Sequence, residues 1–113
     1  MKLLTKELLQ KLPSTEKARG VDNPTVWVKF FFPDAGWTWF MCGYDPEDEL
    51  CWGLVDGHEI EIGDFSLKEL RQIRGKLGCT LERDLYFDPR PMSQLAEELR
   101  QRYPDRIIWG WSD

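Results

Sequence analysis

Residues 25–62 constrain the fold more than any other stretch, because they contain four extended segments separated by residues that favour turns. The segments are residues 26–32, 37–43, 50–55 and 58–62. Each break contains Gly, Pro or Asp, and the last, Asp56-Gly57, has the length of a tight hairpin turn. The spacing therefore predicts a four-stranded antiparallel meander.

Aromatic side chains supply the apolar content of these segments. They are Trp27, Phe30, Phe31, Phe32, Trp37, Trp39, Phe40 and Trp52. Such residues have high strand propensity and stabilise sheets through cross-strand pairs. We therefore expect the sheet to form the core, with Trp39 buried by the alternation of its strand.

The segments before the meander predict one helix and one loop. Leucines recur at helical spacing from Leu3 to Leu12, at positions 3, 4, 8, 9 and 12, with Thr5 as a cap and Pro13 as a stop. Residues 14–24 are polar and contain almost no apolar side chains, so we expect an exposed loop there.

A second helix should begin at Ser66, where Ser66 and Glu69 form a capping box and Phe65 can pack on Leu70. Leu67, Leu70 and Ile73 would be its buried side, and Gly75 and Gly78 would follow its end.

The C-terminal third predicts a strand, a helix and an apolar tail. Residues 79–87 alternate, with Leu81, Leu85 and Phe87 on one side, which predicts a fifth strand with Arg83 on its apolar face. A last helix runs from Met92 to Tyr103 and stops at Pro104. The tail, with Ile107, Ile108, Trp109 and Trp111, should pack on the sheet or bind a partner.

Together these segments predict a single α+β domain over residues 1–113. Its antiparallel sheet has about five strands in a meander, with two to three helices packed on one face.

Charge is distributed unevenly along the chain. The net charge is −5, and no Lys or Arg occurs between Lys29 and Lys68. Nine acidic residues lie in that interval, namely Asp34, Asp45, Glu47, Asp48, Glu49, Asp56, Glu59, Glu61 and Asp64. We call residues 30–67 the Lys/Arg-free interval and expect it to present an acidic surface, which bears on partners.

The cysteines and the N-terminus point to a cytoplasmic protein. Cys42, Cys51 and Cys79 have neither disulfide nor zinc spacing. Lys6 and Glu7 interrupt any signal-peptide core, and no apolar run is long enough for a membrane span. No cofactor is indicated.

Several segments resemble a known family. They are residues 1–8, Phe30-Phe31, residues 37–40, residues 57–70 and residues 81–87, the last reading Leu-Glu-Arg-Asp-Leu-Tyr-Phe. On these the chain resembles an uncharacterised bacterial, plasmid and phage family catalogued as domain of unknown function 2958. The resemblance covers about nine tenths of the chain. It implies a small cytosolic α+β protein of a mobile element and supplies no catalytic residues.

Possible catalytic residues have simpler structural explanations. Glu59 and Glu61 could share a divalent cation with Asp56 or Asp64, but a nuclease would also need a nearby Lys, so we expect a solvated strand face and no metal. His58 has no evident partner nucleophile. For Glu82-Arg83-Asp84, we expect Arg83 to pair with the acidic sheet, and an anion site is the alternative.

The sequence favours a non-enzymatic protein that binds another protein, one that could itself handle nucleic acid, through the acidic sheet. The expected contact residues are Asp45, Glu47, Asp48, Glu49, Glu59, Glu61, Trp37 and Trp39. Single-stranded nucleic-acid binding through the aromatics is the alternative, and a metal-dependent hydrolase comes third. We expect no direct nucleic-acid binding, because such proteins also present Lys and Arg to the phosphates.

Overall fold

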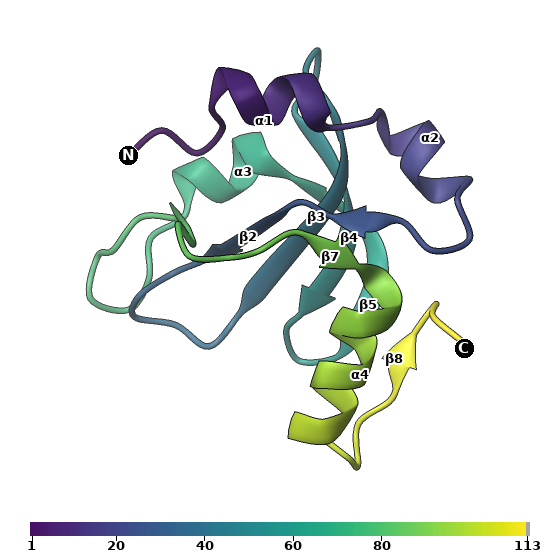
Figure 1. Ribbon diagram of the computed structural model, residues 1–113. Coiled ribbons are helices and arrows are strands. Elements are labelled where there is room, and N and C mark those ends of the chain that lie inside the picture. Colours follow the sequence, from purple (N-terminus) through teal and green to yellow (C-terminus); the bar gives the residue numbers. More distant parts are fainter. Residues whose placement is uncertain (113) are drawn as a thin grey trace.

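A computed structural model describes residues 1–112 and confirms an α+β fold built on a mostly antiparallel sheet (Figure 1). The meander is formed by β2, β3, β4 and β5, paired in sequence order as predicted. Their bounds are Val28–Phe31, Thr38–Asp45, Leu50–Asp56 and Ile60–Ser66. None of the helices in the described residues is long and apolar enough to cross a membrane.

Short strands extend the sheet at both edges. β6 (Glu82–Arg83) pairs with β2, and β8 (Ile108–Trp109) runs parallel to β5, which gives the order β6-β2-β3-β4-β5-β8. β1 (Thr25–Val26) leaves the meander and pairs with β7 (Arg90–Pro91) in a separate two-stranded sheet. The first predicted strand is thus divided at Trp27, whose N–H donates to the Met41 carbonyl.

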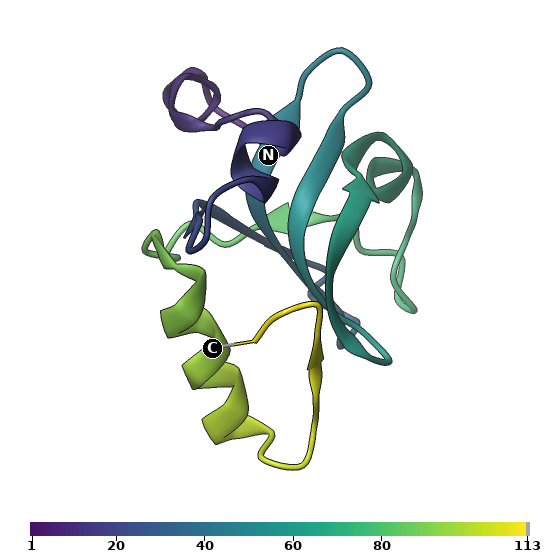
Figure 2. The ribbon, with the colours of Figure 1, turned by 90° about the vertical axis from the view of Figure 1, so that its right-hand side faces the viewer.

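Helices cover both faces of the sheet, so the prediction that they pack on one face is wrong. One core cluster joins leucines of the N-terminal segment to Leu67 and Leu70 of α3 (Leu67–Gln72). The other joins Ala18 of α2 (Thr15–Arg19) to Leu95 and Leu99 of α4 (Met92–Arg102). Figure 2 shows α3 and α4 on opposite sides of the sheet. A sheet whose strands alternate two sets of apolar residues must bury both faces.

The alternation is visible in β3. Trp39 and Met41 belong to the first cluster, and Phe40 and Cys42 to the second. A bulge between Met41 and Gly43 then shifts the register against β4. The fold depends on glycine at position 43, because a Cβ there would lie 2.8 Å from the Ala18 Cβ of α2.

α1 (Lys6–Lys11) forms as predicted, because the Thr5 hydroxyl accepts the Leu8 N–H and Leu12 ends the helix before Pro13. Leu3 and Leu4 precede the helix and are buried, while Leu8 and Leu12 pack partly buried against the same cluster. Leu9 differs from the other four leucines, since 43% of it is exposed.

Residues 14–24 are not simply an exposed loop, because α2 lies within them. The Ser14 hydroxyl accepts the Lys17 N–H and caps the helix, and Thr15 and Ala18 are buried. A helix of five residues is too short to persist alone. It forms because Asp45, 30 residues further on, accepts hydrogen bonds from Thr15.

α3 begins where the capping box predicts, since the Ser66 hydroxyl accepts the Glu69 N–H at 3.1 Å. Leu67 and Leu70 are buried as expected, but Ile73 is 49% exposed. The helix ends at Gln72, and Ile73 with extended backbone is its C-cap. Its position on the helical stripe therefore does not bring it into the core.

The predicted fifth strand over residues 79–87 shrinks to β6, in which only Glu82 and Arg83 pair with β2. Leu81 is buried, but Leu85 and Tyr86 are exposed, because a turn at residues 84–87 carries the chain away from the sheet. The alternation in the sequence therefore corresponds to a strand only at Glu82 and Arg83.

The last helix is confirmed as α4, with Met92, Leu95, Ala96 and Leu99 buried. The tail then returns to the sheet, where Ile108 is buried in β8 and Trp111 packs against the second cluster. Of the two arrangements expected for the tail, the structure shows the one in which the tail packs on the sheet.

Candidate functional site

The structure does not bring the eight expected contact residues together, because they lie at opposite ends of β4. Asp45 pairs with Leu50 at one end, and Thr38 pairs with Asp56 at the other. Seven residues of strand separate the two ends by roughly 20 Å. We call residues 45–49 the hairpin tip and residues 56–59 the distal turn.

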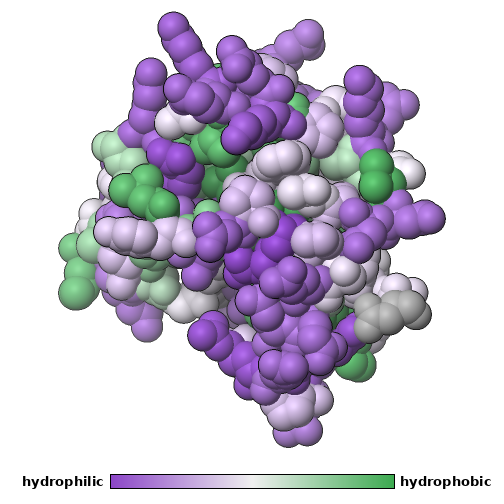
Figure 3. Space-filling view, in the orientation of Figure 1, coloured by the Kyte–Doolittle hydropathy of each residue, from purple (hydrophilic) through white to green (hydrophobic). Residues whose placement is uncertain are grey.

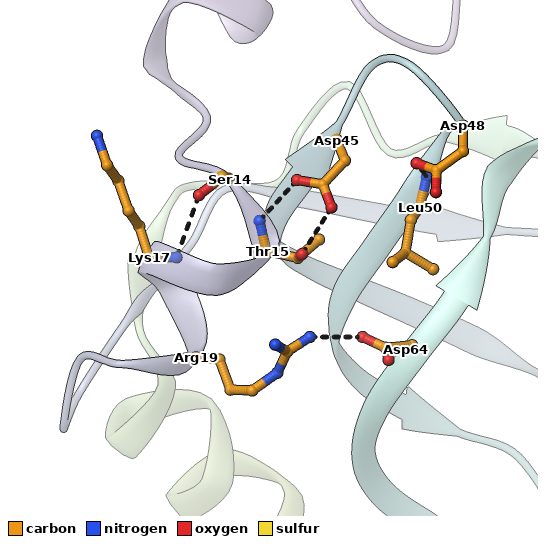
Figure 4. Close-up of polar contacts among 8 residues, drawn as sticks. All are labelled: Ser14, Thr15, Lys17, Arg19, Asp45, Asp48, Leu50 and Asp64. Carbon is orange, nitrogen blue, oxygen red and sulfur yellow. Dashed lines mark hydrogen bonds and ion pairs between the residues drawn. The ribbon is translucent and has the colours of Figure 1, made fainter.

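Asp45 holds the base of the hairpin tip to α2 (Figure 4). One carboxylate oxygen accepts the Thr15 N–H at 3.0 Å, and the other accepts the Thr15 hydroxyl at 2.7 Å. These two bonds, the backbone one first, lower the pKa of Asp45 below its usual value. Asp45 therefore has a structural task, and both of its oxygens are engaged.

Glu49 closes the other side of the tip. It adopts a left-handed backbone with φ 55°, forms an ion pair with Arg71 of α3, and its carbonyl accepts the Leu67 N–H. Asp48 accepts the Leu50 N–H at 3.3 Å, as Figure 4 shows, and Glu47 is exposed. Glu47 and Asp48 are therefore the carboxylates that the tip presents to solvent.

A groove of about 540 Å³ separates α1 from the hairpin tip. We call it the tip groove. It is lined by Leu9, Leu12 and Ser14 on one side and by residues 44–48 on the other. Figure 3 shows mainly hydrophilic side chains over the top of the molecule, where α1 and the hairpin lie in Figure 1, with hydrophobic atoms between them.

At the distal turn, Trp39 and Trp37 differ in what they can contact. Trp39 is 7% exposed and packs edge-to-face on Phe32, so it belongs to the core as expected. Trp37 is 38% exposed and packs against Trp39 and His58. A Cβ at Gly57 would come within 2.6 Å of the Trp37 ring, so the indole requires glycine in this turn.

Three residues, 57–59, connect β4 to β5, and not the two expected. Asp56 pairs with Ile60, and within the turn the Gly57 N–H donates to the Glu59 carbonyl at 2.9 Å. The strand that follows begins at Ile60, so His58 and Glu59 belong to the turn and not to β5. His58 lies within the turn and edge-on to Trp37, with 5.1 Å between the ring centroids.

The C-terminal segment supplies partners for the acids of the distal turn. Arg106 donates to the Asp56 carboxylate at 3.1 Å and to the carbonyls of Gly57 and His58. The Trp109 indole N–H donates to Glu59 at 2.9 Å. Glu61 is exposed beside Trp109 in the paired strands. Trp109 thus has a role that the sequence left open.

Three of the four carboxylates considered for a cation bind protein groups, and the fourth, Glu61, is exposed. Asp56 binds Arg106, Glu59 binds Trp109, and Asp64 binds Arg19 of α2 at 3.1 Å (Figure 4). Within residues 1–112, no group of three or more His, Cys, Asp or Glu side chains is arranged to hold a metal ion. The arrangement offers structural ion pairs in place of a cation site.

Within the described residues 1–112, Arg83 does not form the ion pair expected of it. The pair at this edge joins Asp84 to Lys29 of β2, with 3.6 Å between charged atoms. The Nε of Arg83 is buried without a hydrogen-bond partner, and its backbone N–H donates to the Met1 sulfur. The expectation that Arg83 would pair with the acidic sheet is therefore wrong.

The thiols of the sheet, Cys42 and Cys51, are buried. Burial raises the pKa of Cys42 and of Cys51 to about 12, so neither is a nucleophile at neutral pH. Cys79 is only partly buried, and its pKa is raised by desolvation and by Asp34.

Sequence reasoning missed the arginines that reach the acidic sheet. Arg19, Arg71 and Arg106 all lie outside the Lys/Arg-free interval, yet they pair with Asp64, Glu49 and Asp56 inside it. Basic residues gather in both flanks of the interval, which was the available signal. Which acid each would reach depends on the packing of α2, α3 and the tail.

Comparison with known proteins adds a family but no activity. No curated protein and no solved structure matches the chain. The model of a family described as protein of unknown function (DUF2958) matches residues 3–103. Since most of the sheet, the helices α1 to α4 and the hairpin tip lie inside that match, the chain belongs to the DUF2958 family.

Proposed function

We propose that the protein is a non-enzymatic accessory protein of a mobile element, a phage or a plasmid, that acts in the cytoplasm by binding another protein. One observation carries the proposal. Of the acids of the Lys/Arg-free interval, Glu49, Asp56 and Asp64 pair with arginines. Asp34, Asp45 and Glu59 accept hydrogen bonds from other protein groups. Glu47 and Asp48 are presented together at the hairpin tip, whereas Glu61 is exposed at the other end of β4.

Presented carboxylates favour a basic partner. Charge complementarity raises association rates and suppresses wrong partners more than it raises affinity. A protein that handles nucleic acid carries clusters of Lys and Arg for the phosphates. We infer that the partner is such a protein, a host-defence or plasmid-maintenance factor, and that the acidic tip occupies its basic surface and inhibits it.

The position of the tip supports this use. The hairpin is anchored at its base by Asp45 on α2 and by Glu49 on α3. Its acids therefore stand on a rigid support, which reduces the entropy lost on binding. Trp37 and the exposed Glu61 lie at the other end of β4 and would need a separate contact.

Single-stranded nucleic-acid binding remains the alternative, and the partial exposure of Trp37 is the observation that favours it. Base stacking needs an accessible ring and cations for the phosphates. Trp39 is buried, which leaves one of the two expected stacking rings accessible.

Capture of partners from bacterial lysate tests the proposal. The immobilised wild type is compared with a Glu47→Gln/Asp48→Asn variant and with the control Glu61→Gln, which removes an exposed acid at the opposite end of β4. We expect a basic protein to be captured by the wild type and by the control, and to be lost with the double variant. The main effect of the double variant should be on the association rate.

The alternative predicts a different result. A labelled single-stranded oligonucleotide should not bind the wild type at physiological salt, because acidic residues repel phosphate. Micromolar binding that disappears in Trp37→Ala would replace the protein-binding proposal with the nucleic-acid one.

A further inference from the structure

The tip groove combines an unused apolar side chain with the presented acids. Leu8 of α1 and Leu12, the C-cap of this helix, pack against the core. Leu9 is 43% exposed and lines the groove. Leu9 has no evident role in the core, and the helix does not require an apolar residue there, because polar residues such as Gln have a similar helix propensity. Pro46 faces the same space from the hairpin.

The charge lining the groove is of one sign. Asp45, Glu47 and Asp48 line it, and no Lys or Arg does. This differs from the rest of the Lys/Arg-free interval, where arginines from three flanking elements pair with Glu49, Asp56 and Asp64. An occupant of the groove would therefore gain from positive charge and from apolar surface together.

We propose that the tip groove docks a segment of the partner protein in which a large apolar side chain is flanked by lysine or arginine. This inference rests on the proposed function and names the part of the partner that is recognised. A volume of about 540 Å³ is within the range of sites that bury ligand side chains.

The contacts follow from the lining. The apolar side chain of the segment packs on Leu9, Leu12 and Pro46, together with the alkyl stems of its basic residues. The charged ends reach Glu47 and Asp48 at the rim. Asp45, whose oxygens are engaged by Thr15, adds to the negative potential without leaving its place.

Defined peptides test the docking directly. The probe is a fluorescein-labelled 12-residue peptide, of the length of a few helical turns, with leucines and lysines at helical spacing. One comparison peptide replaces the leucines by serine, and another replaces the lysines by glutamate. Binding is measured by fluorescence anisotropy at low and at physiological salt.

We expect the lysine–leucine peptide to bind the wild type and both comparison peptides to bind at least about tenfold more weakly. Leu9→Gln and Glu47→Gln/Asp48→Asn should each weaken the lysine–leucine peptide about tenfold, a difference of ~1.4 kcal/mol. Leu85→Gln, which changes an exposed leucine outside the groove, should leave it unchanged. Unchanged melting temperatures of all variants show that the fold is intact.

The outcomes separate the inference from the function on which it rests. Equal binding of the lysine–serine and lysine–leucine peptides, or no effect of Leu9→Gln, overturns the groove inference and leaves the acidic tip as the site. Capture of the partner protein that persists in Glu47→Gln/Asp48→Asn overturns the proposed function itself.

Discussion

The two ends of β4 carry similar acidic sequences and use them differently. At the distal turn, the C-terminal segment covers the acids, since Arg106 and Trp109 bind Asp56 and Glu59. At the hairpin tip, only the bases of the hairpin are engaged, through Asp45 and Glu49, and the residues between them face solvent. An acid thus stabilises the fold where a group from a flanking segment reaches it, whereas Glu47 and Asp48 at the tip face solvent.

The largest effect should come from removing the aromatic support of the distal turn. Trp39→Ala should lower the free energy of unfolding by about 3–5 kcal/mol, because it empties a buried site beside Phe32. Trp37→Ala, at a partly exposed ring, should lower it by only about 1 kcal/mol, as for the loss of an aromatic pair. Urea unfolding measures both. Equal losses would contradict the difference in burial.

The next effect should come from the arginine that ties the tail to the distal turn. Arg106→Ala leaves a mostly buried Asp56 carboxylate and two carbonyls without their donor, and should cost about 2 kcal/mol. Lys76→Ala, which changes an exposed basic residue in the loop after α3, is the matched control and should unfold at the wild-type urea midpoint. Equal stability of the two variants would mean that the contact of Arg106 with the distal turn does not stabilise the fold.

Acid should loosen the base of the hairpin tip. The pKa of Asp45 is lower in the folded chain than its ordinary value of 3.8, so the carboxylate contributes stability that is present above that value. This stability is lost as the pH falls below 3.8 through the folded pKa. Between pH 6 and pH 3 the melting temperature of Asp45→Asn should therefore fall less than that of the wild type. A parallel fall in the two proteins would remove Asp45 from this role.

The smallest effect on stability should come from the acids that the tip presents. Glu47→Gln/Asp48→Asn should change the free energy of unfolding by no more than about 0.5 kcal/mol, because Glu47 is exposed and an asparagine keeps the oxygen that accepts the Leu50 N–H. Thermal unfolding at neutral pH checks this. A loss as large as that of Arg106→Ala would mean that the two ends of β4 do not differ in their use of acids.

Local signals in the sequence determined the elements that form through near neighbours. The four-strand meander, the cap of α1 at Thr5, the start of α3 at Ser66 and the extent of α4 were predicted from alternation, capping and helical spacing. These features depend on contacts a few residues apart or on pairing across short turns. The acidic hairpin between residues 45 and 50 was predicted in the same way.

Tertiary structure alone decided everything that depends on residues far apart in the chain. α2 exists because Asp45 and Gly43 lie against it, although its own sequence is typical of a loop. Residues 79–87 alternate like a strand, but only two of them form a strand with β2, because a turn at residues 84–87 carries the chain away from the sheet. Which acids remain free was likewise set by where Arg19, Arg71 and Arg106 arrive, since an ion pair forms over a few ångströms of space whatever the distance in sequence.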